Sequence, residues 1–113
     1  MTDILKALSI CAVALPALML ATPAKAEMTG DQIKAAVSGK TMDFAGKYNG
    51  VMNFGTDGSA SMTLKVGIKK TGKWFIKGNE FCSQWDGEGE QCGTWTDAGG
   101  KYTTSNGYTM TPQ

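Results

Sequence analysis

The chain has 113 residues, with eleven lysines, no arginine, no histidine and a formal net charge of +1. A charge this close to neutral gives no support for a nucleic-acid partner or an anionic membrane surface, because both favour a strong basic excess. The absence of histidine excludes the Ser-His and Cys-His pairs that activate a nucleophile. The length suits one domain.

The first 26 residues have the three-part layout of a cleavable secretory signal peptide. Lys6 supplies the basic start, an apolar run covers residues 7–21, and an Ala-Lys-Ala sequence ending at Ala26 precedes the expected cleavage site. The apolar run is shorter than the roughly 20 residues that span a bilayer, and Pro16 interrupts it. We therefore expect a periplasmic or secreted location, with no transmembrane segment after cleavage.

Residues 27–113 are expected to form a single β-rich domain. Their nine lysines and nine acidic residues leave a net charge near zero. A domain of this size buries only about 60–65% of the surface of its unfolded chain, so its core is thin. A cross-link would then contribute a large share of the total stability.

A short helix is predicted at the start of this domain. Thr29 suits the N-cap, and Gln32 stands three residues later, which is the spacing of a capping box. Ile33 and Val37 share one apolar stripe at helical spacing. Gly39 is placed to end the helix, which gives it about two turns.

From Tyr48 onward the apolar residues recur with a period of two, which is typical of strands that bury one face. Gly-rich turns separate seven expected strands, at residues 48–54, 60–68, 73–77, 80–85, 90–95, 101–104 and 108–110. The predicted fold class is mainly β: a short N-terminal helix plus an antiparallel β-meander of about seven strands, closed as a small barrel or a sandwich.

The apolar faces also predict how these strands pair. Matching them across the first hairpin places Met52 opposite Met62 and Phe54 opposite Ala60. Val66 and Ile68 continue the alternation of the second strand, so we expect them on its buried face. The chain is then expected to turn at residues 71–72.

Three cysteines occur, and Cys11 lies inside the apolar run that leaves with the signal peptide. The two that remain, Cys82 and Cys92, are expected to form a disulfide in an oxidising compartment. A tight loop between them places them directly across a hairpin, with Trp85 and Trp95 on the opposite face. A metal or redox pair would need a Cys-x-x-Cys spacing or further thiolate or imidazole ligands, and the sequence offers neither.

The order of these motifs carries a resemblance. Thr29-Gly-Asp-Gln-Ile, Asp57-Gly, Gly72-Lys-Trp and Cys82-x-x-Trp follow one another before Cys92. In this order the chain resembles small secreted alphaproteobacterial domains of unknown function, in which a helix precedes a β-meander with a Gly-x-Trp strand and two cysteines. The resemblance covers nearly all of residues 27–113. It implies a periplasmic location, a calycin-like β fold and no catalytic residues.

One acidic cluster is a weak candidate for metal binding. Asp86, Glu88 and Glu90 lie on a Gly-rich turn, and carboxylates in such a turn suit Ca²⁺. A solvated hairpin tip explains the same residues, and we expect no cofactor. A hydrolase with paired carboxylates would need two such groups facing each other across a cleft, which one turn does not supply.

Aromatic side chains concentrate towards the end of the predicted sheet. Four of them are candidates for a binding surface: Trp85, Trp95, Tyr102 and Tyr108. Aromatic rings dominate interaction hot spots, so exposed members of this group would form a recognition surface. The alternative is that the rings cover the single core of a thin sheet.

Together these features favour a non-catalytic periplasmic binding or interaction module, which engages a protein or a small ligand of the cell envelope. We expect a monomer with no nucleic-acid partner and no catalytic residue. The alternative hypothesis is a carboxylate-dependent hydrolase that acts on cell-envelope glycans. The missing histidine and the lack of a carboxylate pair weigh against it.

Overall fold

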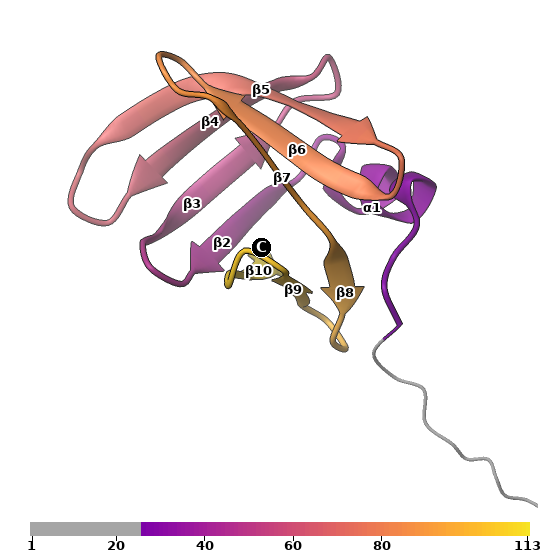
Figure 1. The fold of residues 1–113 in the computed structure, drawn as a ribbon. Coiled ribbons are helices and arrows are strands. Elements are labelled where there is room, and N and C mark those ends of the chain that lie inside the picture. The colour runs from indigo at the N-terminus through magenta and orange to yellow at the C-terminus, as the bar shows by residue number, and fades with distance from the viewer. Residues whose placement is uncertain (1–25) are drawn as a thin grey trace, which may run out of the picture.

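A computed structural model describes residues 26–113, so the predicted signal peptide lies outside the described residues except for Ala26. The described chain folds into one helix and nine strands (Figure 1). The elements are α1 (Gly30–Val37), β2 (Thr41–Ala45), β3 (Asn49–Phe54), β4 (Ser59–Leu64), β5 (Lys69–Lys77), β6 (Glu80–Trp85), β7 (Glu90–Gly93), β8 (Trp95–Asp97), β9 (Tyr102–Thr104) and β10 (Thr109–Pro112). The predicted class, mainly β with one short helix, is confirmed.

The number of strands is nine rather than about seven, for two reasons. The first is that β2 follows the helix closely and was not recognised, although its buried Met42 and Phe44 alternate with polar neighbours. The second is that the strand expected at 90–95 divides into β7 and β8. Between them, Thr94 exchanges backbone and side-chain hydrogen bonds with Ser105 instead of with β6.

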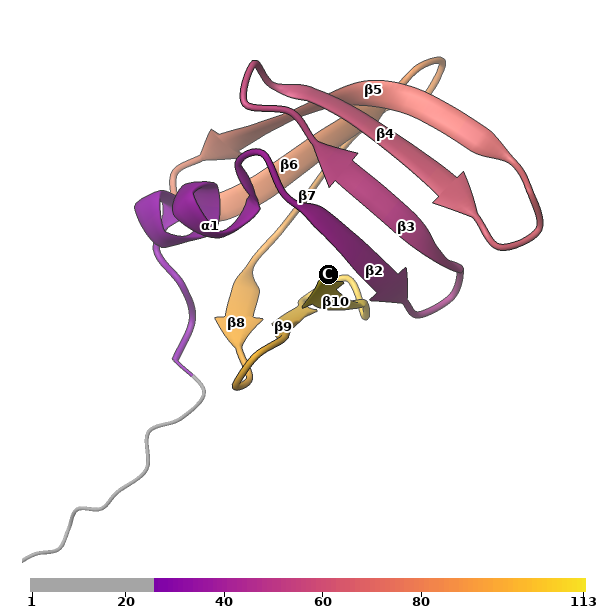
Figure 2. The same ribbon diagram turned by 180° about the vertical axis from the view of Figure 1, so that it is seen from behind.

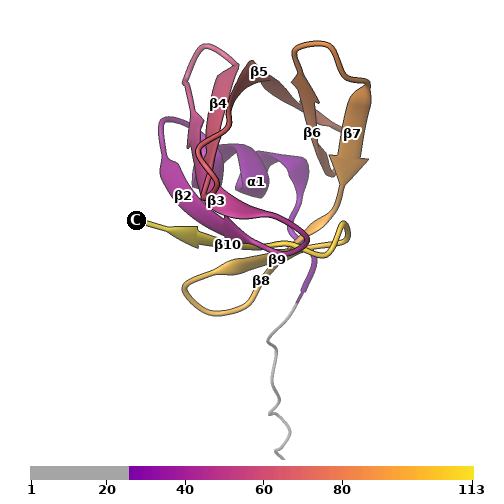
Figure 3. The ribbon, with the colours of Figure 1, turned by 90° about the vertical axis from the view of Figure 1, so that its left-hand side faces the viewer.

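The strands form one antiparallel sheet in the order β7-β6-β5-β4-β3-β2-β10-β9-β8. The sheet curls until its two edge strands, β7 and β8, are successive segments of the chain joined by Thr94 (Figure 3). The segment before the helix covers part of the β8 edge, because Met28 N–H donates to the Trp95 carbonyl at 2.8 Å. The architecture is therefore a nearly closed, barrel-like sheet rather than a sandwich.

Helix α1 lies at one end of this sheet (Figure 2). The predicted capping box is present: the Thr29 hydroxyl accepts from Gln32 N–H, and the Gln32 side chain accepts from Thr29 N–H. Gly30 brings the helix against the β5–β6 turn, since a Cβ there would lie 2.1 Å from the Gly78 carbonyl oxygen. Gly39 follows the helix with a φ of 73°, which favours glycine.

The inward faces of the strands and helix enclose one apolar core. Its buried members are Met28, Ile33, Val37, Met42, Phe44, Phe54, Ala60, Met62, Trp74, Phe81, Trp85, Trp95 and Met110. The predicted pairing of β3 with β4 is confirmed, with Met52 opposite Met62 and Phe54 opposite Ala60. Aromatic rings meet in the middle of this core: Phe81 stacks on Trp74 at 6.1 Å, and aromatic pairs of this kind add about 0.5–1.5 kcal/mol to simple burial.

The β4–β5 hairpin differs from the sequence prediction. Strand β4 ends at Leu64 rather than at Ile68, because Leu64 N–H donates to the Ile68 carbonyl at 2.8 Å and closes a tight turn. Gly67 takes a φ of 98° inside that turn. Val66 and Ile68 are consequently exposed, and the turn expected at 71–72 falls inside β5. The apolar alternation continues past Leu64 to Val66 and Ile68, so the sequence pattern does not show where β4 ends.

Candidate functional site

The predicted disulfide is confirmed. Cys82 and Cys92 are directly paired across β6 and β7, with an Sγ–Sγ distance of 2.07 Å. The Glu90 carboxylate lies beside them, 3.3 Å from the Cys92 sulfur. Both sulfurs are engaged in the disulfide, so this group has no free thiolate to offer a metal ion.

The three carboxylates of the acidic turn do not converge on a common point. Asp86 accepts a hydrogen bond of 2.6 Å from the Thr71 hydroxyl, and Glu88 pairs with Lys70. Glu90 pairs with Lys77, further along β5. Among residues 26–113, these carboxylates are not grouped as a set of metal ligands. Asp86 and Glu88 line a shallow depression of about 360 Å³, but both are engaged with side chains of β5.

The four aromatic candidates lie in or beside the core. Trp85 and Trp95 are 5% and 2% exposed, so of the two possibilities for these rings the core position applies and they form no exposed surface. Their strands curl so that this face points into the barrel, where Trp95 lies 5.1 Å from the ring of Phe81. Tyr102 and Tyr108 are half-buried and pack against the same core. All four rings therefore contribute to the core or cover it, which is the alternative that the sequence left open.

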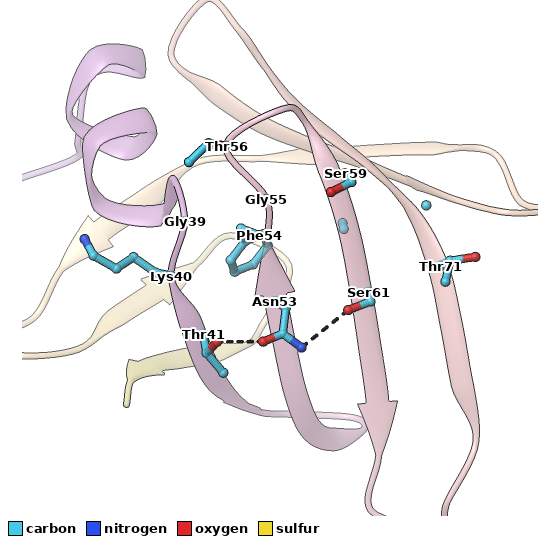
Figure 4. Close-up of a pocket in the computed structure, with 12 residues that line it drawn as sticks. Gly39, Lys40, Thr41, Asn53, Phe54, Gly55, Thr56, Ser59, Ser61 and Thr71 are labelled. Atoms are coloured by element: carbon cyan, nitrogen blue, oxygen red, sulfur yellow. Dashed lines mark hydrogen bonds between the residues drawn. The ribbon is translucent and has the colours of Figure 1, made fainter.

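An open groove of about 560 Å³ lies over β2, β3, β4 and β5 (Figure 4). Four side chains of the outer sheet face cross it in register: Thr41, Asn53, Ser61 and Thr71. Each residue comes from a different strand, and consecutive residues of the row are directly paired across neighbouring strands. Glycines and short side chains around this row leave the hollow open. No motif in the sequence predicts this groove.

Hydrogen bonds link three members of the row and leave the fourth, Thr71, separate from them. The Thr41 hydroxyl donates to Asn53 Oδ1 at 2.6 Å, and Asn53 Nδ2 donates to the Ser61 hydroxyl at 3.4 Å (Figure 4). At the far end the Thr71 hydroxyl donates to Asp86. No hydrogen bond connects the side chains of Ser61 and Thr71 within the described part of the chain. The Ser61 oxygen points toward Asn53 and the Thr71 oxygen points away from Ser61 (Figure 4). The Ser61 hydroxyl still has a proton to donate and the Thr71 oxygen can still accept, so a ligand lying over the row can bond to either.

Charge is sparse at the groove. Of the described residues that line it, Lys40 is the charged one, and its side chain extends away from the row (Figure 4). Asp57 stands beside the groove in the β3–β4 turn. The Ser59 hydroxyl and N–H both donate to this carboxylate, at 2.7 and 2.9 Å, and hold the pKa of Asp57 below its usual value. The groove thus offers hydroxyl and amide groups rather than an acid or a base.

Comparisons with family models, with curated proteins and with solved structures found no match to this chain. The resemblance to secreted alphaproteobacterial domains therefore stays a prediction. No helix within residues 26–113 is long and apolar enough to cross a membrane. The fold and the groove describe a small barrel-like antiparallel sheet with a helix at one end and, on its outer face, a polar groove in which Lys40 is the one charged residue among the described lining residues.

Proposed function

We propose that this protein is a non-catalytic binding module of the bacterial cell envelope, and that the groove over β2–β5 binds its ligand. The observation that carries the proposal is the interrupted row of Thr41, Asn53, Ser61 and Thr71. Hydrogen bonds link its first three members, and a bond to Asp86 fixes Thr71. The Ser61 hydroxyl proton and the Thr71 oxygen remain free to bond to a ligand that lies over the row. This pattern suits a neutral ligand that carries both a donor and an acceptor, such as a sugar hydroxyl or an amide.

The electrostatics of the groove support binding rather than catalysis. No acidic side chain is among the described residues that line it. The carboxylates that a glycan hydrolase would use are engaged elsewhere: Glu88 and Glu90 pair with lysines, and Asp86 accepts from Thr71. A glycosidase needs one carboxyl group as acid and another as base or nucleophile on opposite sides of the bond it cleaves.

The proposed location is the periplasm or the exterior of the cell. The predicted signal peptide supports it, as does the disulfide, because disulfides persist in oxidising compartments. A ligand in that location would be a hydroxyl-rich or amide-rich component of the envelope.

The test is a titration followed by NMR, with neutral oligosaccharides and peptidoglycan fragments as the probes. We expect the amide signals of Ser61 and Thr71 to shift on addition of a ligand. Ser61→Ala and Thr71→Val should each weaken binding by about ten-fold, as expected when a hydrogen-bonded group loses its partner. Thr63→Ala is the matched control, because Thr63 lies on β4 two residues from Ser61 and outside the groove.

Two results would contradict this proposal. One is binding that the Ser61 and Thr71 variants leave unchanged. The other is turnover of peptidoglycan fragments that Glu88→Gln abolishes, because that result would assign the hydrolase activity instead.

A further inference from the structure

Two neighbouring turns, β2–β3 and β4–β5, lie at the end of the sheet away from α1 (Figures 1 and 2). Both turns carry exposed apolar side chains. Val66 is 80% exposed, Tyr48 53% and Ile68 52%, and these are the large exposed apolar residues of the described chain. We call this end of the molecule, formed by residues 46–48 and 65–70, the apolar tip. Scattered exposed apolar residues need no explanation, but three on adjacent turns form a local feature.

Backbone hydrogen bonds hold the apolar side chains outward. The β4–β5 turn is closed twice, from Leu64 N–H to the Ile68 carbonyl and from Gly67 N–H to the Leu64 carbonyl, both at 2.8 Å. Lys65 N–H donates to the Asn49 carbonyl at 2.9 Å and ties this turn to the β2–β3 hairpin. Val66 and Ile68 therefore cannot fold back on the core without breaking these bonds, and the exposed positions belong to the fold.

Lysines surround these apolar side chains. Lys47, Lys65, Lys69 and Lys70 all lie on the apolar tip, and the same residues 46–48 and 65–70 contain no acidic residue. Lys70 pairs with Glu88, whereas the other three form no ion pair with a described residue. The net charge of the domain is near zero and gives no sign of this arrangement, because folding brings four lysines to one end, where Glu88 pairs with one of them.

We propose that the apolar tip docks on a membrane surface that contains anionic phospholipids. Val66 and Ile68 would enter the boundary between headgroups and acyl chains, as apolar side chains of peripheral proteins do. The lysines would lie at the level of the phosphates, where each basic residue strengthens attachment to an anionic leaflet. Tyr48, with an apolar ring and a polar hydroxyl, suits the same boundary.

Two features favour a lipid surface over a protein partner. Three apolar side chains are far too few for a stable protein interface, which buries roughly 1,200–2,000 Å². The charges of the apolar tip are of one sign and surround the apolar residues, which matches the layered charge of an anionic leaflet. Docking at this end leaves the α1 end of the groove, with Gly39, Gly55 and Thr56, free in solution.

The test uses the purified oxidised protein and two kinds of vesicle, phosphatidylcholine alone and phosphatidylcholine mixed with phosphatidylglycerol. We expect co-sedimentation with the anionic vesicles and little with the neutral ones. The double variant Val66→Ser/Ile68→Ser should bind more than ten-fold more weakly. Lys65→Gln and Lys69→Gln should each lose about five-fold, and added salt should weaken the attachment of the unmodified protein.

Lys101→Gln is the matched control for charge, since Lys101 is exposed in the β8–β9 turn and lies outside the apolar tip. Circular dichroism should show that every variant keeps its strand content and melting temperature. No binding to anionic vesicles, or equal binding by the Val66→Ser/Ile68→Ser variant, would overturn the proposal. Concentration-dependent self-association that this variant abolishes would also overturn it, by assigning the apolar tip to a second copy. None of these results bears on the groove, whose variants lie elsewhere.

Discussion

Gly72 shows how one residue permits the close pairing of two strands. It stands opposite Trp85, and a Cβ at its position would lie 2.2 Å from the Gln84 carbonyl oxygen and 2.8 Å from the Trp85 Cα. Backbone atoms of a central strand cannot move aside as the end of a flexible side chain can. We expect Gly72→Ala to lower the free energy of unfolding by about 1–3 kcal/mol, as overpacking of a well-packed site does.

Gly89→Ala is the control for this substitution. A Cβ at Gly89 meets nothing within 4 Å, and its backbone is not in the left-handed region. This variant should keep the stability of the unmodified protein, or gain a little from the stiffer unfolded chain. Urea denaturation of all three proteins measures the effect. Equal loss in both variants would show that glycine matters at these positions for a reason other than the approach of β5 to β6.

At the scale of elements, the β6–β7 hairpin is the part of the molecule that depends on a covalent bond. The disulfide joins residues ten positions apart in a hairpin whose strands already pair. It therefore restricts the unfolded chain more than it builds the hairpin. Reduction should lower the free energy of unfolding by about 2–5 kcal/mol. We expect a strong fall in melting temperature while the protein stays monomeric.

Thermal melts with and without reductant measure this loss, and size-exclusion chromatography checks the oligomeric state. Cys82→Ala/Cys92→Ala is the matched variant, and its melting temperature should equal that of the reduced protein and not respond to reductant. Two titratable thiols in the oxidised protein under denaturing conditions would contradict the assignment.

Elements whose signals are local could be predicted from the sequence. The capping residues of α1, the pairing of Met52 with Met62 and that of Cys82 with Cys92 all follow from short-range patterns, and all three are present. The end of β4 could not be predicted, because Val66 and Ile68 continue the apolar alternation although Val66 lies inside a turn that the hydrogen bond from Leu64 N–H to the Ile68 carbonyl closes. The period-two pattern depends on which side chains are apolar, whereas the end of a strand depends on where the backbone hydrogen bonds change partners.

The site was harder to predict than the fold. Thr41, Asn53, Ser61 and Thr71 are ordinary residues for the outer face of a sheet, and no motif connects them. They meet because three consecutive registers align them. One of these requires β2, and another requires β5 to begin before residue 71. The sequence prediction contained neither β2 nor the early start of β5, so it could not place these four residues in one row.

At the scale of the whole molecule, strand β10 completes the barrel-like sheet. It pairs with β2 on one side and β9 on the other, and it contributes the buried Met110 to the core. We expect deletion of residues 109–113 to abolish cooperative unfolding. The exposed edges of β2 and β9 should also cause association between molecules, because unpaired strand edges recruit other chains.

Deletion of Gln113 alone is the control, since it leaves all of β10 in place. Circular dichroism during thermal unfolding and light scattering measure the two effects. A cooperative, monomeric protein without residues 109–113 would show that the remaining sheet is stable while open, and that closure by β10 is dispensable.

The pairing of β2 with β10 has a consequence for the order of events during biosynthesis. Among the described residues, β2 is the first strand and β10, one of its two partners, is the last, with Asp43 opposite Thr111. Pairing between such distant segments forms slowly, because a long loop must close before any contact compensates for it. Because β10 follows β2 and β9 along the chain, the sheet cannot close before β10 is available to pair with both strands. Until then β2 and β9 each have an edge without its partner, and only the arrival of β10 completes the sheet.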